Sequence, residues 1–136
     1  MFHIDETLSF VPVGIAVLTV SDTRSAADDR SGDVLAERIT ASGHRLMGRA
    51  IVRDEVNAIR QQVKAFAAFP GIDAIITTGG TGFTGRDVTP EALEPLFDKR
   101  MDGFSFMFHS ISAQKIGTST IQSRVTAGLM GTTFIF

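Results

Sequence analysis

Strand-like and helix-like segments alternate along the first part of the chain, and this alternation restricts the fold more than any other feature. Residues 15–20 form an apolar run of the kind that is buried on both faces of a parallel sheet. Further strands are expected at residues 45–52 and 72–78, separated by amphipathic helices that stop at Gly43 and Pro70. This order predicts a three-layer α/β/α fold with a mostly parallel sheet.

The rest of the chain is expected to complete this fold. Thr89 is a predicted helix N-cap, and Pro95 follows so closely that we expect a short turn and then a new helical start. A later helix is expected to contact the core or another subunit. Its apolar stripe consists of Phe104, Met107, Phe108 and Ile111. Residues 125–130 and 133–136 predict a hairpin, and therefore one antiparallel strand near the C-terminus.

The composition fits one globular domain over residues 1–136, with residues 1–13 as an N-terminal arm that contacts a neighbouring subunit. The net charge of −2 argues against a nucleic-acid surface or an anionic membrane surface, because both need clustered Lys and Arg. The absence of cysteine excludes disulfides and thiolate chemistry, and the three histidines show no zinc-ligand spacing. No apolar stretch could span a bilayer and no signal peptide is recognisable, so we expect a cytoplasmic location.

A glycine-rich loop occupies residues 79–87, between a buried strand and a helix start. Glycine lets a ligand approach the backbone, and the helix that follows presents unpaired N–H groups and a partial positive charge, so phosphate is the usual ligand. Asp87 in the same loop would repel a bare phosphate, and it suits a divalent cation placed between the two. The alternative is a tight connection in which Asp87 bonds local amides.

Polar residues follow three of the expected strands. Ser21 and Asp22 follow the first, Asp54 follows the second, and the glycine loop follows the third. Because the carboxyl ends of parallel strands meet at one edge, Asp54 and Asp87 form a candidate Mg²⁺-phosphate centre for phosphoryl or nucleotidyl transfer. As alternatives, Asp54 caps the next helix and Asp22 is a turn residue. The loop has no Walker A lysine and no dinucleotide-binding glycine pattern, which argues against P-loop and Rossmann proteins.

Several motifs resemble a known family. They are Thr78-Gly79-Gly80-Thr81-Gly82, then Arg86-Asp87-Val88-Thr89-Pro90-Glu91-Ala92, with Val20-Ser21-Asp22-Thr23 upstream. The family is that of the molybdenum cofactor biosynthesis proteins MoaB and MogA, with the related gephyrin G domain. The segment at residues 28–32, together with Gly117-Thr118-Ser119 and Ser123-Arg124, is most similar to the MoaB branch. The resemblance covers nearly the whole chain.

The resemblance implies an adenylyltransferase reaction. Active members transfer AMP from MgATP to the terminal phosphate of molybdopterin and release pyrophosphate. By motif, the two family carboxylates correspond to Asp54 and Asp87, which would bind Mg²⁺ and act in catalysis. The residues expected to contact pterin, phosphate or nucleotide are Ser21, Asp22, Thr78, Gly79, Gly80, Thr81, Gly82, Ser119 and Ser123.

The resemblance also implies assembly into homotrimers, which pair into homohexamers in the MoaB branch. In the family a Pro-Gly-containing loop and a C-terminal helix follow the last strand, whereas this sequence ends at Phe136. The resemblance leaves two possible functions open. One is a molybdopterin adenylyltransferase. The other is a non-catalytic, oligomeric pterin-binding or assembly protein of the same pathway.

Overall fold

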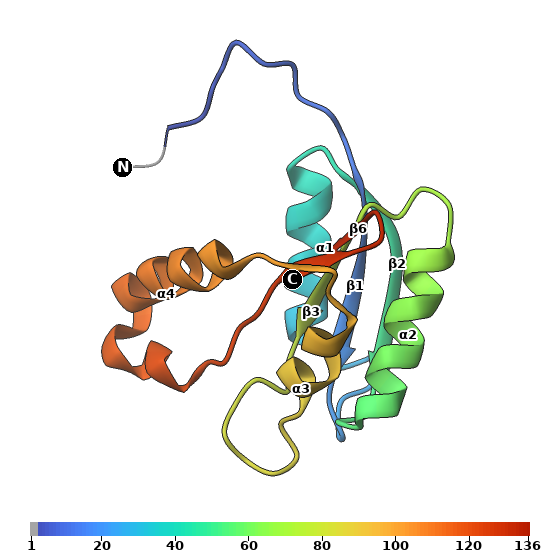
Figure 1. Cartoon of the computed structure of the whole chain (residues 1–136), viewed down its shortest axis with the longest axis vertical. Coiled ribbons are helices and arrows are strands. Elements are labelled where there is room, and N and C mark those ends of the chain that lie inside the picture. The colour runs from blue at the N-terminus through green and yellow to red at the C-terminus, as the bar shows by residue number, and fades with distance from the viewer. Residues whose placement is uncertain (1–2) are drawn as a thin grey trace.

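A six-stranded sheet lies at the centre of the computed structural model, which describes residues 3–136 (Figure 1). The strands are β1 (Gly14–Val20), β2 (Arg45–Val52), β3 (Ala74–Thr78), β4 (Lys99–Arg100), β5 (Gly128–Met130) and β6 (Thr133–Ile135). Their order across the sheet is β2-β1-β3-β6-β5-β4. Strands β2, β1, β3 and β6 pair in parallel, and β5 is antiparallel to both of its neighbours. The mostly parallel sheet with one antiparallel strand near the C-terminus is thus confirmed.

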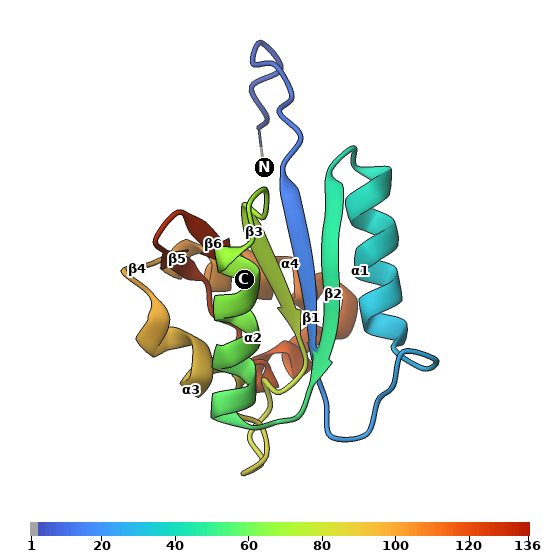
Figure 2. The same cartoon turned by 90° about the vertical axis from the view of Figure 1, so that its right-hand side faces the viewer.

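Helices cover both faces of the sheet, as predicted. They are α1 (Arg30–Ala41), α2 (Val56–Ala68), α3 (Thr89–Leu93) and α4 (Asp102–Ile116), with two 3-10 segments, η1 (Glu94–Leu96) and η2 (Gly117–Gln122). Figure 2 shows α1 and α2 on opposite sides of the sheet. Helix α3 packs in the same core as α2, and α4 lines a cavity together with α1. The α/β/α fold is confirmed.

All seven residues of β1 are buried, because alternate side chains face the two helical layers. One set packs with α2 and α3 in the larger core, and the other packs with α1 in the smaller core. The larger core contains Ala16, Leu18, Val20, Ile59, Val63, Ile72, Ile75, Ala92, Leu93 and Ile135. The smaller core contains Ile15, Val17 and Ile39, with Val13, Leu35, Ala74 and Ile76 packed against it.

The segment around α3 differs from the prediction. Thr89 is the first residue of α3 and not its N-cap, and the position before it, Val88, makes no side-chain capping bond. The Thr89 hydroxyl instead donates to the Gly79 carbonyl at 2.8 Å. The helical start expected at Pro95 is only the η1 turn, and it is followed by β4, a strand too short to leave a sequence pattern.

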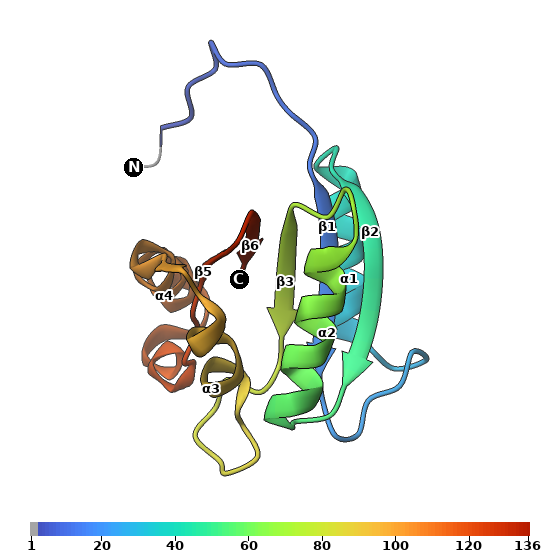
Figure 3. The same ribbon diagram turned by 45° about the vertical axis from the view of Figure 1, so that its right-hand side comes forward.

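Helix α4 and the N-terminal arm both expose apolar side chains. No side chain of α4 is fully buried, and Phe106 is 71% exposed, so the helix does not enter the core. Residues 3–13 form no helix or strand, and Ile4, Leu8 and Phe10 are exposed. Figure 3 shows the arm rising from the start of β1 away from the helices. Met1 and Phe2 of the predicted arm lie outside the described residues. Among residues 3–136, no helix is long and apolar enough to cross a bilayer.

Candidate active site at the carboxyl edge of the sheet

The loops that follow β1, β2 and β3 meet at one edge of the sheet, because these three strands are adjacent and parallel. From β1, which lies between β2 and β3, the chain passes to β2 on one side, and it then returns to β3 on the other. The reversal leaves a crevice between the loops after β1 and β3, which is where open α/β sheets bind ligands. Ser21 and Asp22 lie in the first of these loops, and the glycines lie in the other.

Two glycines at the end of β3 have a backbone conformation that other residues rarely adopt. Gly79 and Gly80 have φ values of 96° and 69°. A Cβ on Gly79 would overlap the Val20 carbonyl oxygen, and one on Gly80 would overlap the Thr89 hydroxyl. The Thr89 amide also donates to the Gly80 carbonyl at 3.0 Å, so the loop folds tightly between β1 and α3. Because α3 has only five residues, the loop amides are better candidates for phosphate contact than the expected helix dipole.

Asp54 is a half-buried acid at the end of β2. It does not cap α2, because Glu55 is in the cap position and makes no side-chain capping bond. Burial raises the pKa of the Asp54 carboxyl, and the negative charges of Asp22 and Asp87 raise it further. No side chain among residues 3–136 donates a hydrogen bond to its carboxylate, and its own amide donates to Asp22 Oδ1 at 3.1 Å. The Arg86 charge partly offsets this effect, but its guanidinium is bonded to Asp22, so the net shift of the Asp54 pKa stays upward and negative charge remains concentrated at this edge.

Asp22 connects the loops after all three strands. Arg86, from the glycine loop, donates from Nε and Nη2 to the two Asp22 oxygens, each at 2.9 Å. This fork holds the pKa of the Asp22 carboxyl below its usual value, and the Asp54 amide acts in the same direction. Asp22 is thus more than a local turn residue, since its partners lie far away in the sequence.

Asp87 has the local bonds of the alternative interpretation and also lies near the other acids. Its Oδ2 accepts hydrogen bonds from the Thr84 amide at 3.0 Å and from the Thr84 hydroxyl at 2.7 Å. At the same time its charge acts on Asp54. The turn from Thr84 to Asp87 therefore uses one carboxylate oxygen, and no hydrogen bond to Oδ1 is made by the described residues.

The other predicted contact residues are divided between the site and its surroundings. The Ser21 hydroxyl accepts from the amides of Thr23 and Arg24, so it shapes the loop after β1. Ser123 directly precedes Arg124, whose amide donates to the Thr81 carbonyl at 2.9 Å, and it therefore lies beside the glycine loop. Ser119 is exposed in η2 and takes part in none of these contacts.

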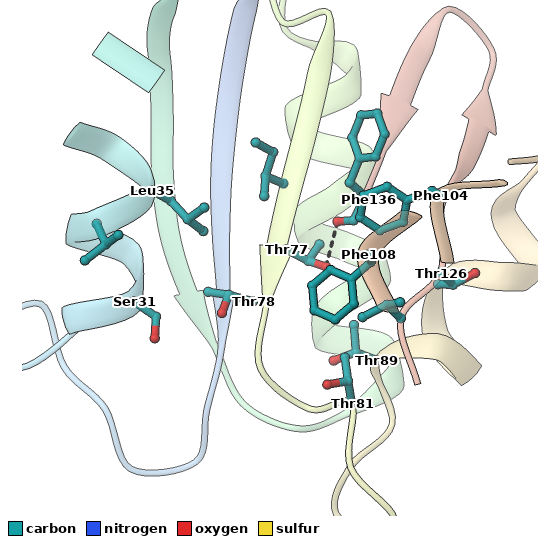
Figure 4. Close-up of a pocket in the computed structure, with 13 residues that line it drawn as sticks. Ser31, Leu35, Thr77, Thr78, Thr81, Thr89, Phe104, Phe108, Thr126 and Phe136 are labelled. Carbon is teal, nitrogen blue, oxygen red and sulfur yellow. Dashed lines mark hydrogen bonds between the residues drawn. The ribbon is translucent and has the colours of Figure 1, made fainter. Parts of the chain in front are cut away.

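A cavity of about 430 Å³ opens beside the glycine loop, between α1 and α4. Its apolar walls include Val34 and Leu35 from α1, and its polar part includes the hydroxyls of Thr78, Thr81 and Thr89. Figure 4 shows the rings of Phe104, Phe108 and Phe136 on one side and Thr81 and Thr89 below them. A ligand with a flat apolar part and a polar end would suit this lining.

Two arginines and one serine of this region were not among the predicted site residues. Arg86 donates two hydrogen bonds to the Asp22 carboxylate, and Arg124 donates to the backbone of the glycine loop. Ser31 lines the cavity. Arg86 and Arg124 both stood in the family motifs, so the signal was present in the sequence. Their contacts could not be inferred from spacing, because Arg86 lies 64 residues from Asp22 and Arg124 lies 42 residues from Gly82.

The donor set fits a hard divalent cation. No group of three or more His, Cys, Asp or Glu side chains among residues 3–136 would enclose a metal ion. Mg²⁺ does not need such a cage, because it is usually bound by one or two carboxylates together with substrate phosphates and water. A cation beside Asp54 and Asp87 would offset the charge that raises the pKa of Asp54. Two of the three histidines make other contacts, His44 with the Val13 amide and His109 with the Thr120 hydroxyl.

Comparison with known proteins decides the family. The sequence family described as "Probable molybdopterin binding domain" matches residues 16–136, which contain every acid of the site. The chain belongs to this family. Its role is therefore in molybdenum cofactor biosynthesis, and the predicted resemblance is confirmed.

Individual members of the family are similar over most of the chain. Molybdenum cofactor biosynthesis protein B of Escherichia coli (strain K12) is 46% identical over 127 residues, which are 93% of this chain and 75% of the relative. The protein of the same name from Bacillus subtilis (strain 168) is 40% identical over 121 residues, which are 88% of this chain and 71% of the relative.

Solved structures of the family have the same fold. A crystal structure of molybdenum cofactor biosynthesis protein B has a TM-score of 0.87 at 37% identity, and the match covers 95% of this chain and 82% of that one. A MogA structure has a TM-score of 0.79 at 28% identity, covering 90% and 81%. The similarity thus extends to both branches named by the sequence motifs.

Proposed function

We propose that this molybdopterin-binding family member transfers AMP from MgATP to the terminal phosphate of molybdopterin. A phosphate oxygen of molybdopterin forms a bond to the α-phosphorus of ATP, the bond from that phosphorus to the bridging oxygen breaks, and pyrophosphate leaves. The observation that carries the proposal is the half-buried Asp54 carboxylate, which lies near the charges of Asp22 and Asp87 and beside the glycine loop, and which accepts no hydrogen bond from a described side chain.

The reaction brings two anions together, the molybdopterin phosphate and the ATP phosphates, and the residues of the site suit it because they can bind a cation and phosphate oxygens. Mg²⁺, when bound, supplies the positive charge that stabilises the transferring phosphoryl group. Asp54 and Asp87 would hold it, and the amides of the Gly79–Gly82 segment would contact phosphate oxygens. Little else is required of the side chains, since positioning and charge stabilisation account for most of the catalysis of such transfers.

The cavity between α1 and α4 is our proposed place for the pterin. Its phenylalanine side suits the flat ring system, and its threonine side lies next to the glycine loop, where a phosphate end would be needed. The pterin ring would then lie against the phenylalanines, and its phosphate would lie at the end of the same pocket next to the glycine loop. Ser119 and Ser123 remain predicted contacts on the η2 side of that pocket.

The alternative is a non-catalytic, oligomeric pterin-binding or assembly protein. The apolar residues exposed on α4 and the arm favour assembly, and we propose that these two segments form subunit contacts in a homotrimer or homohexamer.

Sedimentation velocity tests the assembly. Phe106→Ser, at a side chain that is 71% exposed, is expected to weaken it without lowering monomer stability by more than about 0.5 kcal/mol. If the sedimentation coefficient of this variant equals that of the parent protein, Phe106 is not part of the contact. If the parent protein itself is monomeric, assembly is contradicted.

The catalytic proposal is tested by incubating the protein with molybdopterin, ATP and Mg²⁺ and following pyrophosphate release. Adenylylated molybdopterin and pyrophosphate are expected in equal amounts. Binding of molybdopterin without pyrophosphate release would favour the non-catalytic alternative. The cytoplasmic location expected from the sequence stays a prediction.

A further inference from the structure

Arg124 reaches the glycine loop from a distant part of the sequence. It directly follows η2 and Ser123, and its backbone amide donates to the Thr81 carbonyl at 2.9 Å. Its Nε donates to the Gly82 carbonyl at 2.7 Å, and its Nη2 donates to the Asp87 carbonyl at 2.8 Å. Arg124 therefore bonds the backbone of the loop on both sides of the turn that carries Asp87.

The remaining edge of the guanidinium is fixed as well. Arg124 Nη1 pairs with both Glu91 oxygens, at 2.9 and 2.8 Å, and the guanidinium lies 5.5 Å from the centre of the Phe83 ring. Its side chain is only 28% exposed. A lysine could not make these contacts, because they require a planar group with several N–H donors in a fixed arrangement.

The loop needs such a connection, because it has few other attachments. Residues 83–86 are exposed, and Gly82 and Gly85 allow the backbone many conformations. Thr89 fixes the stem of the loop at Gly79 and Gly80, and Arg86 ties its tip to Asp22. Between these two points, Arg124 is the one residue among 3–136 outside the loop whose side chain donates hydrogen bonds to it.

We propose that Arg124 is a positioning residue that keeps the glycine loop in the conformation in which Asp87 lies beside Asp54. The proposal rests on the proposed function in one respect only, the use of Asp87 as a ligand. Arg124 itself touches neither acid side chain among the contacts described above, and it acts through the backbone carbonyls of Gly82 and Asp87.

Amide hydrogen exchange tests the positioning in the protein without ligands. Arg124→Lys keeps the charge and loses the fork, so the amides of Thr84 and Asp87 are expected to exchange about tenfold faster, while those of β1 are unchanged. Glu91→Gln keeps both bonds to the loop carbonyls and is expected to change the exchange of these amides less than about twofold. Unchanged loop exchange in Arg124→Lys, or equal acceleration in the loop and β1, overturns the proposal.

The Mg²⁺ dependence of pyrophosphate release gives a second readout. In Arg124→Lys the Mg²⁺ concentration for half-maximal rate is expected to rise about tenfold, with a smaller change in the KM for molybdopterin. The matched control is Arg100→Lys, at a surface arginine paired with Glu94 and Asp102, and it should leave both values unchanged. A lower melting temperature with an unchanged Mg²⁺ requirement assigns Arg124 to stability alone. If the parent protein releases no pyrophosphate, the proposed function fails, and the exchange measurement still decides the positioning.

Discussion

The two faces of the sheet are built differently. The packed face, covered by α2 and α3, holds the larger core with ten buried apolar residues, whereas the open face, covered by α1 and α4, holds a core of three buried apolar residues and the cavity. Hydrophobic burial supplies most of the stability of a small domain, so the packed face should carry most of it. The open face holds the cavity that we propose for the pterin. On this proposal, most of the stability and the pterin site are on opposite faces of the same sheet.

The largest expected effect is a core substitution that breaks the packed face. Leu93 in α3 is 1% exposed, and Leu93→Ala should lower the free energy of unfolding by about 3 kcal/mol, because it leaves a cavity that the surroundings cannot fill. Leu35→Ala, at a half-buried helix position beside the existing cavity, should cost about 1 kcal/mol. Urea denaturation measures both. Equal losses would show that the two faces contribute alike.

The next effect concerns a polar network on the open face. The Asp29 carboxylate is 2% exposed and accepts bonds from Thr19, Gly32 and Arg49. Burial acts to raise the pKa of Asp29, but these hydrogen bonds together lower it. Asp29→Asn should therefore cost about 2 kcal/mol at pH 7.

The same network predicts a pH dependence. A depressed pKa in the folded state stabilises the protein above the unfolded value of about 4, and this contribution is lost as pH falls through the folded pKa. The gap between the parent protein and Asp29→Asn should accordingly shrink below about pH 4. Asp33→Asn, at the more exposed partner of Arg49, should cost less than about 0.5 kcal/mol. A gap that stays constant down to pH 2 would show that the charge of Asp29 is unimportant.

The smallest expected effect has the opposite sign. The pKa of Asp54 is raised by burial and by its acidic neighbours, so its ionised form weakens the fold once pH rises above the unfolded value. Asp54→Asn should increase the free energy of unfolding at pH 7 by about 0.5 kcal/mol and abolish the proposed adenylylation. Thermal unfolding measures the change in stability. A loss of stability would mean that Asp54 has a structural partner.

Much of the packed face could be predicted from the sequence. The apolar run in β1 follows from a local pattern, because a strand buried on both faces leaves a continuous signal. The predicted bounds of β2 also agree with the structure, although this edge strand is only partly buried. β4 left no signal, since its pairing with β5 depends on tertiary structure. The apolar stripe of α4 left core and subunit contact open, because a periodic stripe shows that a helix has an apolar face but not what that face contacts; the structure excludes the core.

The site was predicted in outline but not in its connections. Parallel strands guaranteed that Asp22, Asp54 and the glycine loop would meet at one edge, and they do. The predicted helix-cap role of Thr89 was wrong because the glycine loop folds back far enough to use its hydroxyl. The catalytic and metal-binding roles of Asp54 and Asp87 stay predictions.

The most direct test of the central claim is the rate of pyrophosphate release by Asp87→Asn at saturating Mg²⁺, ATP and molybdopterin. The amide oxygen can still accept the bonds from Thr84, so the fold should survive, and the rate should fall at least about a hundredfold. Asp102→Asn, at an acid that is 80% exposed at the start of α4, serves as the matched control and should retain the parent rate. A folded Asp87→Asn protein with the parent rate would contradict the account.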